Sequence, residues 1–274
     1  MVSITTVPVK TYLAKSKIPG FDYAINPYTG CTHQCLYCYA EYMRKFTGHS
    51  EPWGQFLDVK ICTAPLKPAQ LFHTHILLSS VTDAYNPFEK KYERTHQILQ
   101  QLVYCQAYVH ILTKSSLVLR DVDLLKQLPQ SEVCFSFSSS QDTVRQQLEP
   151  QTSSVDEKIN ALKILHENNI QTAVMIAPIF PQITDWKEII AQTRAYTNEY
   201  RFDSLNMRPY FFRHVMDYIE VNYPHLVGLY TDIYLNNNKT YWKNLAQEIE
   251  TFCTEQQLNA SIFLSDATEK QPVY

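Results

Sequence analysis

The chain has 274 residues, of which 45% are hydrophobic, so it can fill the core of one large domain or of two small ones. Its formal charge of −3 and its lack of a long basic run disfavour a broad nucleic-acid interface and leave only a local groove for that role. The five glycines form neither a G-x-G-x-x-G nor a Walker pattern, which excludes a glycine-rich phosphate loop.

The predicted elements follow a β/α rhythm along the chain. A strand, FDYAINPY (21–28), comes before a cysteine-rich loop, and short apolar runs alternate with amphipathic stretches from about residue 72 onward. Ser154 with Glu157, and Asp185 with Glu188, have the spacing of helix N-terminal caps. We therefore expect further strands at 75–80, 107–114, 132–138, 172–180 and 202–207, and helices at 89–105, 119–128, 153–170 and 186–200.

Six strands joined by helical crossovers must run parallel. Six β/α units fall short of the eight that close a full barrel, so the predicted fold class is α/β, a partial (β/α)6 barrel over residues 1–209 with the cysteine loop at 26–40. Residues 210–274 are expected to form a mostly helical C-terminal extension that covers an edge or the mouth of the barrel. Its helices are predicted around 211–223, 225–235 and 241–253, with a possible strand at 260–265.

The lack of an export-signal pattern and the odd number of cysteines both indicate a reducing compartment. No run of eighteen apolar residues occurs, and the N-terminal segment MVSITTVPVKTYLAK lacks the pattern of an export signal. Seven cysteines, an odd number, make a poor disulfide framework. We expect a cytoplasmic protein with no membrane partner, in which thiols are free to bind metal.

Three cysteines crowd into the stretch NPYTGCTHQCLYCYA, where Cys31, Cys35 and Cys38 have C-x3-C-x2-C spacing. A structural zinc site usually needs four ligands in two pairs, and His33 is the one nearby candidate for the fourth, although so close a ligand would strain the loop. A four-iron cluster held by three cysteines leaves one iron open to an outside ligand. The spacing favours such a cluster, with a zinc loop or buried thiols as the alternatives.

The cysteine spacing, with the aromatic Tyr37 before the last cysteine, resembles the radical S-adenosylmethionine enzymes. The stretches GFDYAINPYTGCTHQCLYCYA, TDAYNPFEKKYERT, ILTKSSLVLRDVDLL, QQLEP and MIAPIFP are similar to the spore photoproduct lyase-related branch, over roughly residues 12–225. The resemblance implies a radical-SAM barrel, a [4Fe-4S] cluster and S-adenosylmethionine, with a low-potential electron donor of the flavodoxin or ferredoxin kind. It also implies that a 5′-deoxyadenosyl radical takes a hydrogen atom from a peptide, a nucleotide or another small molecule.

The resemblance also suggests residues that contact the cofactor. Thr82 and Asp83 stand where the family binds the methionine ammonium, and Lys114 stands where it approaches the carboxylate or ribose. The alternatives are a turn built by Asp83 and a surface lysine at a strand end. The remaining candidates are Ser136 and Ser138, which face the lumen if the phenylalanines between them face the helices, and Ile176 and Pro178, which would flank adenine.

Three residues are candidates for a catalytic role. Tyr37 and Tyr39 bracket Cys38 at positions that the resemblance links to radical transfer, and Tyr37 is also a candidate cofactor contact; simple packing is the alternative. Cys134 shares the predicted face of Ser136 and is a candidate hydrogen-atom donor. The other cysteines, Cys62, Cys105 and Cys253, are expected to be buried thiols.

The sequence leaves the substrate open. DNA photolesion repair is one alternative, but the resemblance places Ser80 where the lyase has a cysteine that gives its hydrogen atom to the product radical, so we expect no such repair. A non-catalytic iron–sulfur or zinc module is an alternative of another class. A carrier of that kind would not need a cofactor pocket spread over several strands.

Overall fold

The structure, a computed structural model, describes residues 2–264. Its largest element is a sheet of eight strands in the order β11-β10-β9-β8-β7-β6-β3-β2, in which every neighbouring pair from β3 to β11 is parallel and β2 is antiparallel to β3. The end strands β11 and β2 are not neighbours, so the sheet is an open, partial barrel. The strands are β2 Leu13–Lys15, β3 Tyr23–Ile25, β6 His75–Leu78, β7 Tyr108–Thr113, β8 Gln130–Phe137, β9 Gln171–Ile179, β10 Glu199–Ser204 and β11 Ala260–Phe263.

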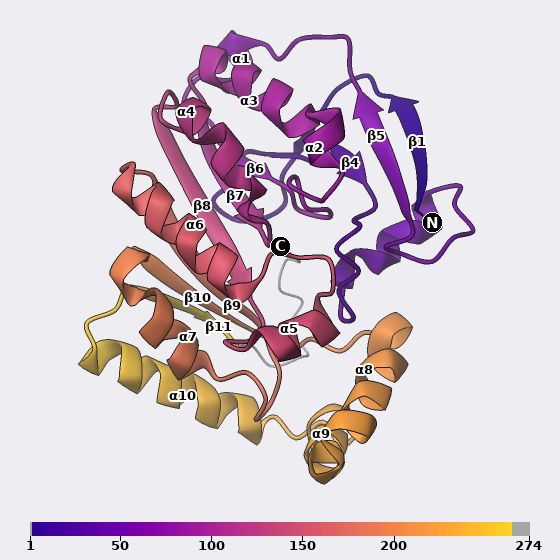
Figure 1. Ribbon diagram of the computed structural model, residues 1–274, viewed down its shortest axis with the longest axis vertical. Helices are drawn as coiled ribbons and strands as arrows, with labels where there is room; N and C mark the ends of the chain where they lie inside the picture. Colours follow the sequence, from indigo (N-terminus) through magenta and orange to yellow (C-terminus); the bar gives the residue numbers. More distant parts are fainter. Residues whose placement is uncertain (1, 265–274) are drawn as a thin grey trace.

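Helices cover one face of this sheet (Figure 1). The capping box predicted at Ser154 and Glu157 is confirmed at the start of α6, and Asp185 accepts a hydrogen bond from the Glu188 amide at the start of α7. The covering elements are α1 Pro68–Leu71, α3 Arg94–Cys105, η2 Ser116–Asp121, α4 Val122–Leu125, α6 Val155–Glu167, α7 Trp186–Thr193, η3 Arg194–Tyr196 and α10 Thr240–Glu255. The short helix α2, Glu89–Tyr92, packs instead through Tyr92 against residues of β4, Tyr28–Thr29, and β5, Phe56–Ile61.

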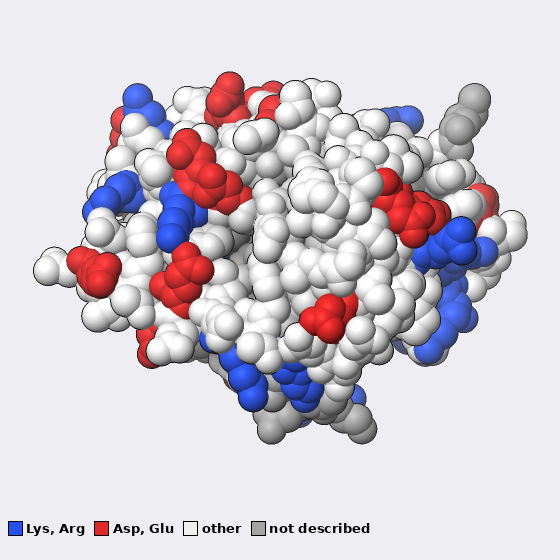
Figure 2. All heavy atoms as spheres, turned by 90° about the horizontal axis from the view of Figure 1, so that it is seen from below, with Lys and Arg blue, Asp and Glu red and all other residues white. Residues whose placement is uncertain are grey.

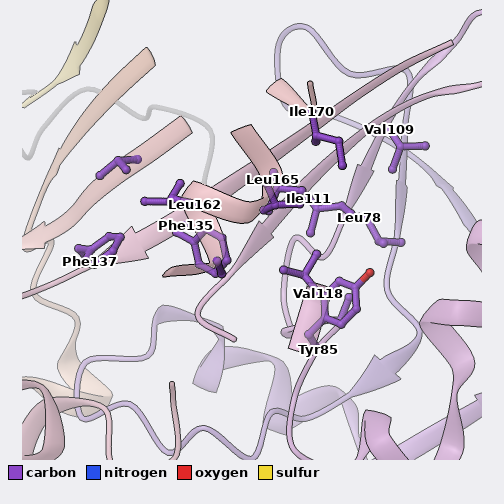
Figure 3. Packing of buried hydrophobic residues seen from close by; sticks show 14 of the residues in the cluster. Leu78, Tyr85, Val109, Ile111, Val118, Phe135, Phe137, Leu162, Leu165 and Ile170 are labelled. Atoms are coloured by element: carbon purple, nitrogen blue, oxygen red, sulfur yellow. The ribbon is translucent and has the colours of Figure 1, made fainter. Parts of the chain in front are cut away.

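The main hydrophobic core lies between the sheet and these helices. Figure 3 shows Phe135 and Phe137 of β8 beside Leu162 and Leu165 of α6, all at most 1% exposed. Since successive side chains of a strand point to opposite faces, the residues between the phenylalanines face the hollow side of the sheet, which we call the lumen. The prediction that Phe135 and Phe137 face the helices is confirmed, and Ser136 therefore faces the lumen.

Several boundaries differ from the sequence predictions. The helix expected at 89–105 is interrupted at Glu93, whose φ of 50° ends α2. The helix expected at 186–200 is shorter, because residues 199–204 already pair with β9 as β10. The possible strand at 260–265 is confirmed as β11 over its first four residues, while its last residue lies outside the described part of the chain.

A second sheet was not predicted. It has three strands in the order β1-β5-β4, with bounds Ser3–Pro8, Phe56–Ile61 and Tyr28–Thr29. In Figure 1, β1 and β5 stand to one side of the large sheet. Because β4 leads directly into the cysteine loop, this sheet fixes where that loop begins.

The segment after β10 is mostly helical, as predicted. It forms α8 Pro209–Asn222, η4 Pro224–Leu226 and α9 Val227–Tyr234 before α10. Phe211 and Val215 of α8 pack in a smaller core with Tyr37 of the cysteine loop and with Leu148 of α5, Asp142–Leu148. Helices α8 and α9 therefore lie against the end of the barrel that carries the cysteines, whereas α10 packs in the main core.

Candidate active site

The cysteine loop lies between β4 and the 3-10 helix η1, Tyr39–Phe46. Gly30 has a φ of +88°, and a Cβ at this position would approach the carbonyl oxygen of Phe56 to 2.5 Å, so only glycine fits. The Thr82 hydroxyl, just after β6, donates to the Gly30 carbonyl at 2.5 Å. Farther along, the Leu36 amide donates to the Leu148 carbonyl at 2.9 Å. The loop is thus held by segments on both sides of it.

The three loop thiols Cys31, Cys35 and Cys38 are free and half-buried. Among the described residues, no three histidine, cysteine or acidic side chains lie close enough together to hold one metal ion. In a four-iron cluster each cysteine binds a different iron, so three thiolates need not converge on one point. A hydrogen-bond donor for sulfur lies beside the loop, because the indole nitrogen of Trp53 is 3.2 Å from the sulfur of Cys38.

Three buried hydroxyls in or near this loop have no hydrogen-bond partner among the described residues. They belong to Thr32, in the loop itself, to Ser79, at the end of β6, and to Ser138, just after β8. Buried polar groups are normally hydrogen-bonded, so such orphans need a reason. Free thiols and unpaired hydroxyls at the carboxyl ends of parallel strands fit a bound cluster and a polar cofactor.

Asp83 is buried and its carboxylate is already bonded to the protein. One oxygen accepts from the Tyr85 amide and the Thr113 hydroxyl, both at 2.8 Å, and the other accepts from the Lys114 amide at 2.8 Å. His33 lies 3.4 Å from the second oxygen, and burial lowers the pKa of this histidine. These contacts tie the cysteine loop to the ends of β6 and β7. The role of Asp83 as an ammonium partner stays a prediction.

Lys114 faces the lumen at the end of β7. Its ammonium donates to the Ser136 hydroxyl at 2.7 Å, and that hydroxyl donates in turn to the Ala177 carbonyl at 2.9 Å. Burial would lower the pKa of Lys114, but the nearby Glu149 carboxylate raises it, so the side chain stays charged. The structure thus brings together two predicted cofactor contacts, Lys114 and Ser136, on neighbouring strands.

Sequence reasoning missed a buried charge cluster behind the loop. Glu149, fully buried, accepts a hydrogen bond from the Tyr37 hydroxyl and lies 3.8 Å from Lys158 and 4.0 Å from Lys114. Burial opposes the charge on Glu149, but the two lysines hold the pKa of its carboxyl below its usual value. Lys158 is fully buried as well, and its ammonium donates to the Ser136 carbonyl at 3.1 Å. The cluster joins the loop to β8 and α6.

The other predicted cofactor contacts differ in their exposure. Ser138 is buried, and its carbonyl accepts from Thr184 at 2.7 Å. Ile176 is 0% exposed and belongs to the core on the helix side, so its side chain does not face the lumen. Only its backbone is placed for the predicted adenine contact. Pro178 follows a cis peptide bond at the end of β9 and is half-buried.

The three predicted catalytic residues lie in different surroundings. The hydroxyl of Tyr37 is bonded to Glu149 and that of Tyr39 to the Ser80 carbonyl, so both tyrosines have structural partners. Cys134 is 3% exposed and lines a cavity of about 210 Å³ on the lumen side, together with Leu112 and Met175. Its place on the serines' face is confirmed, whereas the three catalytic roles stay predictions.

The remaining cysteines are as expected in two cases of three. Cys105 and Cys253 are 1% and 4% exposed and belong to the main core. The expectation of burial is wrong for Cys62, which is half-exposed just after the edge of β5. The strand ends one residue before it, and its thiol donates to the Ala64 carbonyl at 3.4 Å.

Asp203 is a second residue that sequence reasoning missed. It lies on β10, two residues after Arg201, which lines the lumen cavity, and its charge acts on Tyr39 at the end of the cysteine loop. Burial raises the pKa of the Asp203 carboxyl to about 7. The sequence signal was a carboxylate near the end of a barrel strand. That this carboxylate lies near the cysteine loop becomes clear only when the pairing of the strands is known.

The raised pKa of Asp203 predicts a pH-dependent stability. In the unfolded chain this carboxyl titrates near pH ~4, so between about pH 4 and 7 the native state binds the extra proton and stability falls as pH rises. We expect Asp203→Asn to raise the Tm at pH 8 more than at pH 4. Thermal melts at both pH values measure this, and an equal change at both would contradict the assigned environment.

Comparisons with known proteins match this arrangement. The profile of the Radical SAM superfamily matches residues 25–193, from β3 through the cysteine loop to α7. The chain belongs to the radical SAM superfamily. An uncharacterized protein of Methanocaldococcus jannaschii is 36% identical over 248 residues, covering 90% of this chain and 92% of the relative. A radical SAM Nalpha-GlyT isomerase of Pseudomonas phage M6 is 28% identical, covering 62% of this chain and 36% of that protein.

Solved structures of radical SAM enzymes share the fold. Spore photoproduct lyase complexed with dinucleoside spore photoproduct is 19% identical with a TM-score of 0.58, covering 81% of this chain and 66% of that one. Streptococcus suis SuiB bound to S-adenosylmethionine is 12% identical with a TM-score of 0.54, covering 92% and 53%. At these identities the likeness shows the fold alone.

The distribution of surface charge and the hydropathy of the helices bear on possible partners. Figure 2 shows acidic and basic side chains interspersed with uncharged surface on one face of the molecule, so that face has no continuous basic area for a nucleic-acid backbone. No helix among the described residues is both long and apolar enough to cross a bilayer.

Proposed function

We propose that this radical SAM protein is an enzyme that binds a [4Fe-4S] cluster through Cys31, Cys35 and Cys38 and cleaves S-adenosylmethionine reductively. When bound, the cluster and S-adenosylmethionine supply a 5′-deoxyadenosyl radical that abstracts a hydrogen atom from a substrate. The observation that carries the proposal is the set of three free thiols on one loop at the carboxyl ends of the parallel strands, within the matched superfamily region.

The polar groups at the strand ends supply the rest of the proposed site. Lys114 offers a charged donor for a carboxylate or a ribose oxygen, and the orphaned Ser79 hydroxyl offers a further hydrogen bond. The lumen cavity is lined by apolar side chains such as Leu112 and Met175 on one part and by charged ones, among them Arg201, on another. The apolar part of the lining would keep water away from a reactive radical.

The proposal has a direct test. Protein reconstituted anaerobically with iron and sulfide, and reduced with dithionite, should convert S-adenosylmethionine to methionine and 5′-deoxyadenosine. An intact four-iron cluster without any cleavage would refute the enzyme and favour a non-catalytic iron–sulfur module. Replacing dithionite by a reduced flavodoxin or ferredoxin tests the proposed electron donor.

We also propose that residues 1–209 form the catalytic barrel and that 210–274 are an extension packed on it. The Tyr210 hydroxyl of α8 donates to the Tyr39 carbonyl at 2.9 Å, which supports a role for α8 in holding the cysteine loop. The substrate lies among peptides, nucleotides and small molecules. SuiB has been solved bound to its precursor peptide SuiA and the lyase with a dinucleoside, so the shared fold accepts both classes.

We predict that the protein does not repair spore photoproduct. The Ser80 hydroxyl, at the position that resembles the lyase's cysteine, accepts a hydrogen bond from the Asn26 side chain at 3.0 Å. A serine O–H bond is too strong to give a hydrogen atom to a carbon radical, so the closing step would be absent. Incubation of the reduced enzyme with dinucleoside spore photoproduct should yield 5′-deoxyadenosine without thymine pairs. Clean repair would contradict the prediction.

A further inference from the structure

Trp53 lies in the segment between η1 and β5, outside every motif that indicated the cofactor site. Its indole N–H points at the sulfur of Cys38, with 3.2 Å between nitrogen and sulfur. The ring is half-buried and packs edge-on against Phe56, with 5.6 Å between ring centroids. The contact joins the unpredicted small sheet to the proposed cluster ligand.

The position of the indole is fixed from several sides. Phe56, which the indole contacts, also stacks on His49, with 4.0 Å between ring centroids. The ring nitrogen Nε2 of His49 is in turn hydrogen-bonded to the carboxylate of Asp58 in β5 at 2.8 Å. The next residue, Gly54, has a φ of +90°, and its carbonyl accepts from the side chain of Gln34 in the cysteine loop at 3.3 Å. The turn that carries Trp53 is therefore tied to the loop at two points, and the N–H is preorganised toward the sulfur.

A hydrogen bond to a ligating thiolate draws negative charge from the sulfur. Reduction adds an electron to the cluster, so such a bond stabilises the reduced form more than the oxidised form and raises the reduction potential. We propose that Trp53 tunes the cluster in this way, as a positioning and redox-tuning residue that makes the cluster easier to reduce. The inference rests on the proposed function, because it takes Cys38 to be a ligand.

Trp53→Phe tests the inference, because phenylalanine keeps an aromatic ring against Phe56 and removes the N–H. We expect a cluster with unchanged iron content and a reduction potential shifted to more negative values in an anaerobic titration followed by electron paramagnetic resonance. Trp186→Phe is the matched control, since Trp186 lies in α7 among Phe202 and Phe252 and should leave the potential unchanged.

A second measurement does not depend on the variant's folding. The chain has three tryptophans, and the other two lie in α7 and α10. Wild-type protein labelled with ¹⁵N in the indole should show nitrogen hyperfine coupling to the reduced cluster in an electron–nuclear double resonance spectrum. An unshifted potential in Trp53→Phe, or no nitrogen coupling in the wild type, would overturn the inference alone, whereas failure of the wild type to form a four-iron cluster would overturn the proposed function with it.

Discussion

Replacing Cys35 by alanine should remove the iron–sulfur cluster and reduce cleavage of S-adenosylmethionine to background. A methyl group cannot bind iron, and two remaining thiolates are too few to retain a four-iron cluster in this loop. The same loss is expected for Cys31→Ala and Cys38→Ala. Iron and sulfide content, visible absorption and chromatography of 5′-deoxyadenosine measure the result.

Cysteines outside the loop provide the controls. Cys105 lies in the main core on α3, where its thiol acts as a small hydrophobic group, and Cys62 is half-exposed. Cys105→Ala and Cys62→Ala should both keep the cluster and the activity, with a loss of about 1 kcal/mol in unfolding free energy at most. A full complement of iron in Cys35→Ala would show that the ligands have been assigned wrongly.

Glu149→Ala should lower the free energy of unfolding by about 3–5 kcal/mol, because it leaves the fully buried Lys158 without a counter-ion. The Tyr37 hydroxyl loses its acceptor in the same variant. Lys114 is less affected, since its side chain is 18% exposed and can turn to solvent. Chemical denaturation of the cluster-free protein measures the change without interference from iron.

Two further variants separate burial from charge pairing. Adding Lys158→Met to Glu149→Ala removes the unpaired cation and should restore much of the lost stability. Glu167→Ala breaks another lysine–glutamate pair, with Lys163 at 4.0 Å, but both side chains are about half exposed, at 48% and 58%. It should cost at most about 0.5 kcal/mol. Equal losses in Glu149→Ala and Glu167→Ala would contradict the buried pair.

The predictions from sequence succeeded where the signal was local. Strands such as β7 and β9 have a short apolar run, and α6 has its capping box within four residues, so both could be read without knowing the fold. The alternation of Phe135, Ser136 and Phe137 was enough to assign the two faces of β8. The same alternation, applied to β9, would have placed Ile176 on the helix side, because it pairs with Phe137.

What the sequence did not show depends on contacts between distant residues. Tyr37 and Glu149 are 112 positions apart, and nothing near either residue indicates that they meet. The strands β1 and β5 have mixed exposure with no clear alternation, since β1 lies at the edge of a three-stranded sheet. Trp53 was missed because its contact with Cys38 forms only when the segment before β5 folds back onto the cysteine loop.

The cysteine loop has a consequence for the order of events in the cell. Its backbone is bonded to Thr82, Leu148 and Gln151, and its last turn to Tyr210, so part of its support is synthesised long after the cysteines. A nascent chain that ends before Leu148 would lack the contacts with Leu148, Gln151 and Tyr210 and would present the three thiols on a partly supported loop. We therefore expect the loop to reach its final geometry, and the proposed cluster to be held stably, only once these later residues have been added to the chain.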